Sequence, residues 1–247
     1  MRYYSTNNNA ERVDFDTALL NGMASNNGLY MPEFIPRLSQ SKIKDMKGAP
    51  YADIAYTVLS AFLDTIPSSD LKSMLDEAYD ESVIPTKVQQ VADNKHILWL
   101  TKGPTYSFKD YAARFYGRAL NYVLGKRGER RTVFVATSGD TGGAIADALY
   151  GLENIDVVIF YPKNSISKGQ RRQMTTLKNN VYAYEVNGDF DVCQALAKYF
   201  LRDKQFALDL TGDKDNFTSA NSISIGRLLP QSVFPFYAYA HIDGDSI

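Results

Sequence analysis

The sequence predicts an α/β protein with a parallel sheet flanked by helices, preceded by a mainly helical amino-terminal region. From about residue 96 onward, short apolar runs of strand length alternate with helical patterns. The run at residues 156–160 is apolar after its first residue, as expected for a strand that is buried on both faces. Before residue 88 the apolar residues follow helical spacing, and prolines separate the segments.

The amino-terminal region, residues 1–88, is expected to form a helical domain. Residues 51–66 place Ile54 and Val58 on one face of a helix. Ser69 is expected to cap the helix that follows, because serine side chains accept hydrogen bonds from the first free backbone N–H groups.

The remaining elements follow in order along the chain. We expect strands at residues 96–100, 132–136, 156–160 and 181–186, and helices at residues 108–124, from about 140 to 149, near 170–177, and after a cap at Asp189. Gly125 is expected to end the first of these helices. Alternating strands and helices favour a parallel sheet covered on both faces.

Composition excludes several classes of function. The net charge of −1 gives no general attraction to nucleic acid or to a membrane surface. One cysteine, Cys193, rules out a disulfide within the chain, and we expect it to be buried. His96 and His241 have no zinc-binding spacing, so no metal site is expected. The first residues lack the apolar core of a signal peptide, and no run of 18 apolar residues occurs. The prediction is a cytoplasmic protein without nucleic-acid or membrane partners.

A lysine stands at the head of a predicted helix in the segment GPTYSFKD, residues 103–110. Gly-Pro-Thr is typical of a turn, which places Lys109 in the first helical turn. The positive end of the helix dipole disfavours a cation there and so favours the neutral amine that a Schiff base requires. A surface lysine at a helix start is the alternative, and it is the commoner one for a lysine taken alone.

The segment ATSGDTGG, residues 136–143, lies between a predicted strand and a predicted helix. Its glycines let a ligand approach the backbone, and free N–H groups at a helix start bind anions. Ser138 and Thr141 add hydroxyl groups, so a phosphate or carboxylate suits this loop. The pattern is neither a P-loop nor GxGxxG. The alternative is a tight turn with Asp140 as a helix cap.

Two further segments are polar where a buried core would not require it. Lys168 and Arg171 follow the strand at residues 156–160, and loops beyond the carboxyl ends of parallel strands form the ligand crevice. These two cations suit a doubly charged phosphate, although an exposed helix start is the alternative. Asn221 and Arg227 place an amide and a guanidinium group before the apolar carboxyl-terminal helix.

Read together, these segments resemble the threonine synthase family in six places that lie in family order and cover essentially the whole chain. GPTYSFKD resembles the family's HGPTLAFKD, ATSGDTGGA its ATSGDTGSA, QRRQMTT its QRRQMTT, NGDFDVCQ its GxFDDCQ, NSISIGRLLPQ its NSINWARILPQ, and GMASNNGLYMP its GLAPDGGLYVP. Thr101 and Lys102 depart from the family's Phe-His, and Ser224 departs from its asparagine.

The resemblance implies the type II pyridoxal-phosphate-dependent (tryptophan synthase β-like) fold, with pyridoxal 5′-phosphate (PLP) as cofactor. It implies an amino-terminal domain at residues 1–88, the first part of the PLP-binding domain at 89–130, and a smaller substrate-facing α/β domain at 131–240. Residues 241–247 are then expected to begin a linker. Because family members are much longer, the chain is expected to be incomplete at its carboxyl end.

The implied reaction converts O-phospho-L-homoserine and water to L-threonine and phosphate, the last step of threonine biosynthesis. Such an enzyme is a carbon–oxygen lyase that acts on a phosphate ester through a Schiff base on Lys109, which also moves protons at the substrate's α and β carbons. The chain alone is expected to be inactive, and the protein to be a monomer or a homodimer.

The resemblance also implies roles for individual residues. Lys109 is the catalytic residue, and Phe108 and Asp140 join it at the cofactor, with Asp140 near the 3-hydroxyl. The expected substrate-binding residues are Thr105, Ser138, Gly139, Thr141, Lys168, Arg171, Asn221 and Arg227. Two alternatives stay open: another PLP lyase such as a threonine dehydratase, and a non-catalytic relative that binds phosphate or an amino acid.

Overall fold

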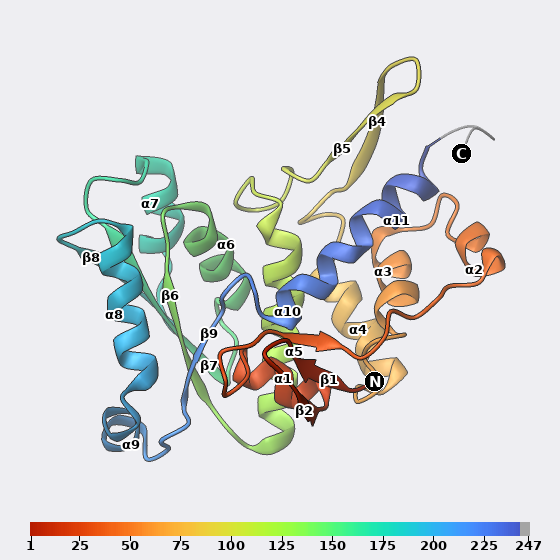
Figure 1. The fold of residues 1–247 in the computed structure, drawn as a ribbon. Helices are drawn as coiled ribbons and strands as arrows, with labels where there is room; N and C mark the ends of the chain where they lie inside the picture. The colour runs from red at the N-terminus through yellow and green to blue at the C-terminus, as the bar shows by residue number, and fades with distance from the viewer. Residues whose placement is uncertain (243–247) are drawn as a thin grey trace.

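The computed structural model describes residues 1–242, except for the side chains of residues 8–10 (Figure 1). The expected linker at 241–247 therefore lies almost wholly outside the described residues. The strands are β1 (Tyr3–Ser5), β2 (Asn8–Val13), β3 (Tyr30–Pro32), β4 (Lys87–Ala92), β5 (Lys95–Trp99), β6 (Arg131–Ala136), β7 (Ile155–Pro162), β8 (Val181–Val186) and β9 (Phe217–Ser219). The helices are α1 (Phe15–Asn21), α2 (Gln40–Asp45), α3 (Tyr51–Leu59), α4 (Ser68–Ala78), α5 (Lys109–Arg127), α6 (Asp140–Leu149), α7 (Lys168–Thr175), α8 (Phe190–Arg202), α9 (Lys204–Thr211), α10 (Ile225–Leu228), the 3₁₀ turn η1 (Leu229–Ser232) and α11 (Val233–Ala240).

The amino-terminal region contains a small antiparallel sheet, in the order β2-β1-β3, that the sequence did not predict. Tyr3 pairs with Val13 on one side and with Pro32 on the other. Tyr3 and Tyr30 are buried on this sheet. The strands are short and partly polar, so they carry little of the alternation by which a strand is recognised in a sequence.

Helix α4 begins one residue earlier than the expected serine cap. Pro67 is the N-cap, and its fixed φ suits the entry to a helix. Ser69 lies inside the first turn and donates a hydrogen bond to Asp70 Oδ1 at 3.1 Å. The expectation that Ser69 caps this helix is therefore wrong, although the helix itself is present.

The expected strand at residues 96–100 is present as β5, but it lies outside the parallel sheet. It pairs with β4 in an antiparallel hairpin in which Lys87 faces Trp99. Figure 1 shows this hairpin extending away from the body of the molecule. The hairpin spans the boundary expected at residues 88 and 89, and the domain boundaries remain a prediction.

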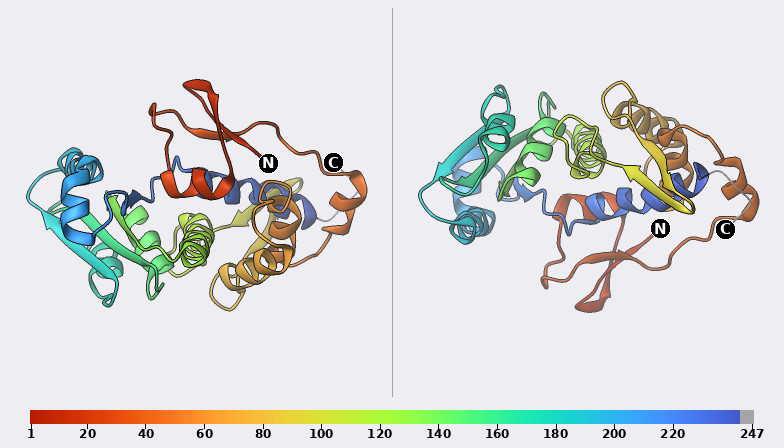
Figure 2. Two further views of the ribbon diagram at one scale, coloured as in Figure 1. Left: turned by 90° about the horizontal axis from the view of Figure 1, so that it is seen from below. Right: turned by 90° about the horizontal axis from the view of Figure 1, so that it is seen from above.

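Helix α5 runs through the middle of the molecule and is mostly buried. In Figure 2 it lies between the parallel sheet and the amino-terminal helices α3 and α4. The helix ends at Gly128, not at the expected Gly125. Gly128 has a φ of 65°, which glycine adopts readily, and its N–H bonds the carbonyls of Leu124 and Gly125.

The predicted parallel sheet is confirmed, with the strand order β8-β7-β6-β9. Val133 pairs with Val157 and with Thr218, and Val157 also pairs with Val181. Side chains alternate between the two faces of the sheet, so each face has its own core. The core on the side of α8 contains Phe134, Phe160, Phe200, Phe217 and the buried Cys193.

On the opposite face of the sheet, Val133, Val135, Val157 and Ile159 belong to the main core, where β7 packs against α6 and α6 packs against α5. Helices therefore cover both faces, as the alternating pattern predicts. Within residues 1–242, no helix combines the length and the apolar character needed to cross a bilayer.

Candidate functional site

The first turns of α5, α6 and α7 meet at the carboxyl end of the parallel sheet (Figure 1). Helix α6 follows β6 directly, and α7 follows β7 after a short loop, so the topology brings both helix starts to this edge. The turn before α5 joins them, because Gln173 Nε2 of α7 donates to the carbonyl oxygen of Thr105 at 3.2 Å. Segments separated by up to 68 residues therefore form one site.

Lys109 is the first residue of α5, so it lies in the first helical turn, as the sequence predicts. Its Nζ lies 3.9 Å from Asp140 Oδ2 and 4.8 Å from the centre of the Phe108 ring. The side chains of Lys109 and Asp140 are 26% and 52% exposed. The amine is thus held beside a carboxylate and remains accessible to a small molecule.

The turn before Lys109 is fixed by Asp110, whose importance the sequence analysis missed. The backbone N–H of Thr105 donates to Asp110 Oδ2 at 3.0 Å, and the Thr105 hydroxyl donates to Oδ1. Asp110 is only 1% exposed. Burial raises the pKa of Asp110, and the two hydrogen bonds from Thr105 oppose that rise.

The backbone at Tyr106 is unusual for a non-glycine residue, with a φ of 60°. The Tyr106 side chain is 75% exposed. A left-handed residue beside a buried aspartate and an accessible lysine is typical of a turn whose conformation is set by a site.

The loop between β6 and α6 is organised by Thr137, which the sequence analysis also missed. The Thr137 hydroxyl oxygen accepts hydrogen bonds from the N–H groups of Gly139 at 3.0 Å and Gly142 at 2.8 Å. Gly139 has a φ of 144° and is the N-cap of α6, so the alternative in which Asp140 caps this helix is wrong. In the described part of the chain, the N–H groups of Asp140 and Thr141 donate to no other group. These two groups are available to an anion.

Helix α7 contributes two glutamines that the sequence analysis did not single out. Gln170 Nε2 donates to Asp140 Oδ1 at 2.7 Å, and Gln173 makes the contact to Thr105. The signal in the sequence was their spacing, because residues three apart share one face of a helix.

Two expected phosphate ligands lie on the same helix, α7. Lys168 is exposed, whereas Arg171 is ion-paired with Glu185 at 3.3 Å.

Asn221 and Arg227 differ in their exposure. Asn221 is exposed and lines a cleft of about 430 Å³ beside β9. Arg227 is 2% exposed, and its Nη1 donates to the carbonyl oxygen of Ala220 at 2.9 Å. Burial lowers the pKa of Arg227, and the nearby Tyr116 opposes this. Within residues 1–242, no hydrogen bond or ion pair links Asn221 or Arg227 to Lys109 or Asp140.

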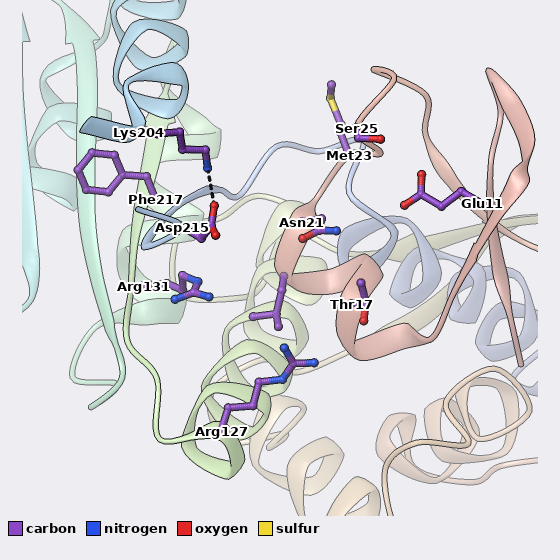
Figure 3. Close-up of a pocket in the computed structure, with 11 residues that line it drawn as sticks. Glu11, Thr17, Asn21, Met23, Ser25, Arg127, Arg131, Lys204, Asp215 and Phe217 are labelled. Carbon is purple, nitrogen blue, oxygen red and sulfur yellow. Dashed lines mark hydrogen bonds and ion pairs between the residues drawn. The ribbon is translucent and has the colours of Figure 1, made fainter. Parts of the chain in front are cut away.

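A cavity of about 520 Å³ lies at the opposite end of the sheet (Figure 3). Its lining includes Arg131 at the start of β6 and Asp215 just before β9. Arg131 is paired with Glu129 and Asp213, and Lys204 is paired with Asp215. The cavity's charges are thus largely matched within the protein, and it is separate from the site around Lys109.

A helix-opening lysine beside an anion-binding loop, at the carboxyl end of a parallel sheet, is the arrangement of a fold type II PLP enzyme. The chain belongs to the pyridoxal-phosphate dependent enzyme family, whose model matches residues 97–225. Family membership also bears out the expected cofactor. Residues 2–79 match a second model, described as threonine synthase N terminus.

Curated relatives carry the name threonine synthase. The protein of Pseudomonas aeruginosa is 39% identical over 96% of this chain and 50% of its own length. That of Escherichia coli K12 is 37% identical over 98% of this chain and 54% of its own length. The chain spans about half the length of the curated relatives it matches.

Solved structures agree with the sequence matches. PLP-bound threonine synthase from Brucella melitensis superposes with a TM-score of 0.88, at 37% identity, over 97% of this chain and 52% of that one. Threonine synthase from Escherichia coli gives a TM-score of 0.86 at 36% identity, over 100% of this chain and 55% of that one.

The residues present fit a phosphorylated aldehyde cofactor. The accessible Lys109 amine is the group that condenses with an aldehyde, and the exposed Phe108 ring lies beside it. The Asp140 carboxylate, 3.9 Å from that amine, could accept a hydrogen bond from a polar group of a molecule bound to Lys109. A Cβ at residue 139 would overlap the side-chain amide of Gln170. Glycine is therefore needed at position 139 for the loop to keep its present packing.

Proposed function

We propose that the complete protein containing this chain is a threonine synthase, which converts O-phospho-L-homoserine and water to L-threonine and phosphate. The observation that carries the proposal is the position of Lys109. Its amine is accessible, opens a buried helix, and lies 3.9 Å from the Asp140 carboxylate in a chain whose two family matches together describe such an enzyme.

Each side chain at the site has its own role in the proposed reaction. Lys109 holds the cofactor and then accepts and returns protons at the substrate's α and β carbons. PLP, when bound, supplies the electron sink for this chemistry. Phe108 and Asp140 would hold the cofactor together with Lys109, and the Asp140 carboxylate would supply a hydrogen-bond acceptor to it.

The substrate's two anionic groups need separate partners. We assign the carboxylate to the loop at residues 138–141, where the N–H groups of Asp140 and Thr141 are available together with the hydroxyls of Ser138 and Thr141. Gly139 and Thr105 are assigned to the same substrate-binding site. The leaving phosphate is assigned to Lys168, Arg171 and Asn221, while the buried Arg227 holds the backbone at Ala220, next to Asn221. Arg171 then exchanges its Glu185 partner for the substrate.

The test uses the complete protein, supplied with PLP and O-phospho-L-homoserine. We expect L-threonine and phosphate to form in equal amounts, and Lys109→Ala to lower turnover about 10³-fold or more. Lys126→Ala, which changes an exposed lysine at the other end of the same helix, is the matched control and should keep wild-type turnover. Undiminished threonine formation by Lys109→Ala would refute the proposal.

The same assay, repeated with L-threonine as the substrate, separates the alternatives. Deamination of L-threonine without any phosphate release would indicate a threonine dehydratase. Binding of PLP or phosphate without turnover would indicate a non-catalytic relative. A cytoplasmic location and a monomeric or homodimeric state belong to the same proposal.

A further inference from the structure

We propose that Gln170 is a positioning residue that holds the Asp140 carboxylate toward the Lys109 amine. The inference deepens the proposed function, because it concerns the same site. Three observations carry it: how the Gln170 amide is held, where it lies over the α6 loop, and how α7 is fixed to the turn before Lys109.

The Gln170 side chain is held at both ends of its amide. Its Oε1 accepts a hydrogen bond from the backbone N–H of Ser167 at 3.0 Å, while the Ser167 hydroxyl accepts from the Gln170 N–H at 3.2 Å. This capping box occupies the oxygen of the amide. The nitrogen is therefore the end that faces Asp140, and it donates to Oδ1 at 2.7 Å.

That contact determines which carboxylate oxygen faces the lysine. With Oδ1 held by Gln170, the other oxygen, Oδ2, is the one that lies 3.9 Å from Lys109 Nζ. Asp140 is half exposed, and a carboxylate in that position rotates unless a partner restrains it. A hydrogen bond to a charged group is stronger than a neutral one, so Gln170 is an effective restraint.

The glycines of the α6 loop leave room for the glutamines. A Cβ on Gly139 would overlap the Gln170 amide, and a Cβ on Gly143 would come within 2.6 Å of Gln173 Oε1. Gln170 and Gln173 therefore rest directly on the backbone of this loop. The loop and helix α7 are packed as one unit.

Helix α7 is also fixed relative to the lysine. Gln173 donates to the carbonyl oxygen of Thr105, and Asp110 holds Thr105 from the other side. Helix α7 and the start of α5 are thus joined through a single residue, Thr105. Gln170 therefore donates its hydrogen bond to Asp140 from a helix that the Gln173–Thr105 contact holds in place relative to Lys109.

A double-mutant cycle tests the role by measuring the reactivity of the Lys109 amine in the complete protein without cofactor. The rate of reductive methylation with formaldehyde and cyanoborohydride, mapped to the Lys109 peptide by mass, reports how reactive the amine is beside its Asp140 partner. Asp140→Asn removes the neighbouring negative charge, so we expect the Lys109 rate at pH 7 to rise about threefold to tenfold.

Gln170→Met keeps the length of the side chain and removes the donor. In this background we expect Asp140→Asn to raise the Lys109 rate less than about twofold, because an unrestrained carboxylate couples weakly to the amine. The matched control is Gln205→Met. Gln205 donates to Asp209 Oδ1 at the same 2.7 Å, on α9, so Asp140→Asn should keep its full effect there.

An equal effect of Asp140→Asn with and without the Gln170→Met change would overturn the proposal, as would no effect in either background. Gln170→Asn, whose amide is one methylene too short to reach Asp140, gives a second comparison if Gln170→Met does not fold.

Borohydride trapping of PLP on the unaltered protein is run in parallel. Failure to trap PLP refutes the proposed function and leaves the amine measurement to decide the role of Gln170.

Discussion

Asp110 is the residue on which the geometry before Lys109 most depends. It is buried and accepts two hydrogen bonds from Thr105, one from the backbone and one from the hydroxyl. In Asp110→Asn, one of the two acceptor atoms becomes an NH₂ group that faces a donor. We expect the free energy of unfolding to fall by about 1–3 kcal/mol, measured by urea denaturation.

The loss in Asp110→Asn should also depend on pH. Because burial raises the pKa of Asp110 in the folded protein, its contribution to stability is fully present below the carboxyl's unfolded pKa of about 4 and falls as pH rises through the folded pKa. The stability gap between wild type and Asp110→Asn should therefore narrow as pH increases across that window. A gap that widens over the same range would contradict the burial argument.

The sequence located some site residues and missed others for a physical reason. Lys109 and Asp140 were predictable at helix starts, because turns and glycines mark those positions locally. The contact of Gln170 with Asp140 joins residues 30 apart, so it depends on how α6 and α7 pack. Arg227 was expected to bind the substrate phosphate, and nothing in its local sequence showed that its guanidinium group is buried.

At the scale of elements, the packing of α6 against α7 requires glycine at residue 142. A Cβ there would overlap Met174 and the Thr137 side chain, whose hydroxyl also accepts the Gly142 N–H. We expect Gly142→Ala to lower the free energy of unfolding by about 1–3 kcal/mol.

Gly169→Ala in α7 is the control for this substitution. A Cβ at Gly169 meets only Ser167 Oγ at 3.8 Å, so this change should be neutral or stabilising by up to about 1 kcal/mol. Thermal or urea unfolding measures both, and equal effects of the two changes would contradict the packing described here.

The parallel strands were predictable from sequence, whereas strand pairing at the amino terminus was not. Strands β6 and β7 are apolar because both of their faces are covered, and that signal is local. The pairing of β1 with β3 joins segments far apart in the chain, as Tyr3 and Pro32 illustrate, and it is stabilised by burial that no short window reveals. The end of α5 was misplaced because Gly125 and Gly128 are both plausible ends, and of these two only Gly128 has a positive φ.

At the scale of the whole molecule, α5 ties the amino-terminal helices to the parallel sheet. Arg114 Nε donates to the carbonyl oxygen of Ala78 at the end of α4 at 2.6 Å. On other sides of α5, Gly117 packs closely against Leu149 of α6, and Tyr116 packs against Gly226 of α10. The Lys109 amine therefore projects from an element that is fixed on several sides, which suits a group that has to be held in one position.

Whether the Lys109 amine holds PLP is tested most directly by trapping the cofactor on the protein. The complete protein is incubated with PLP, reduced with borohydride and digested, and the mass of each lysine peptide is determined. We predict that the added mass of a reduced PLP group is found on the peptide containing Lys109, at about one group per chain. A modified Lys168 or Lys126 peptide with an unmodified Lys109 peptide would contradict the account.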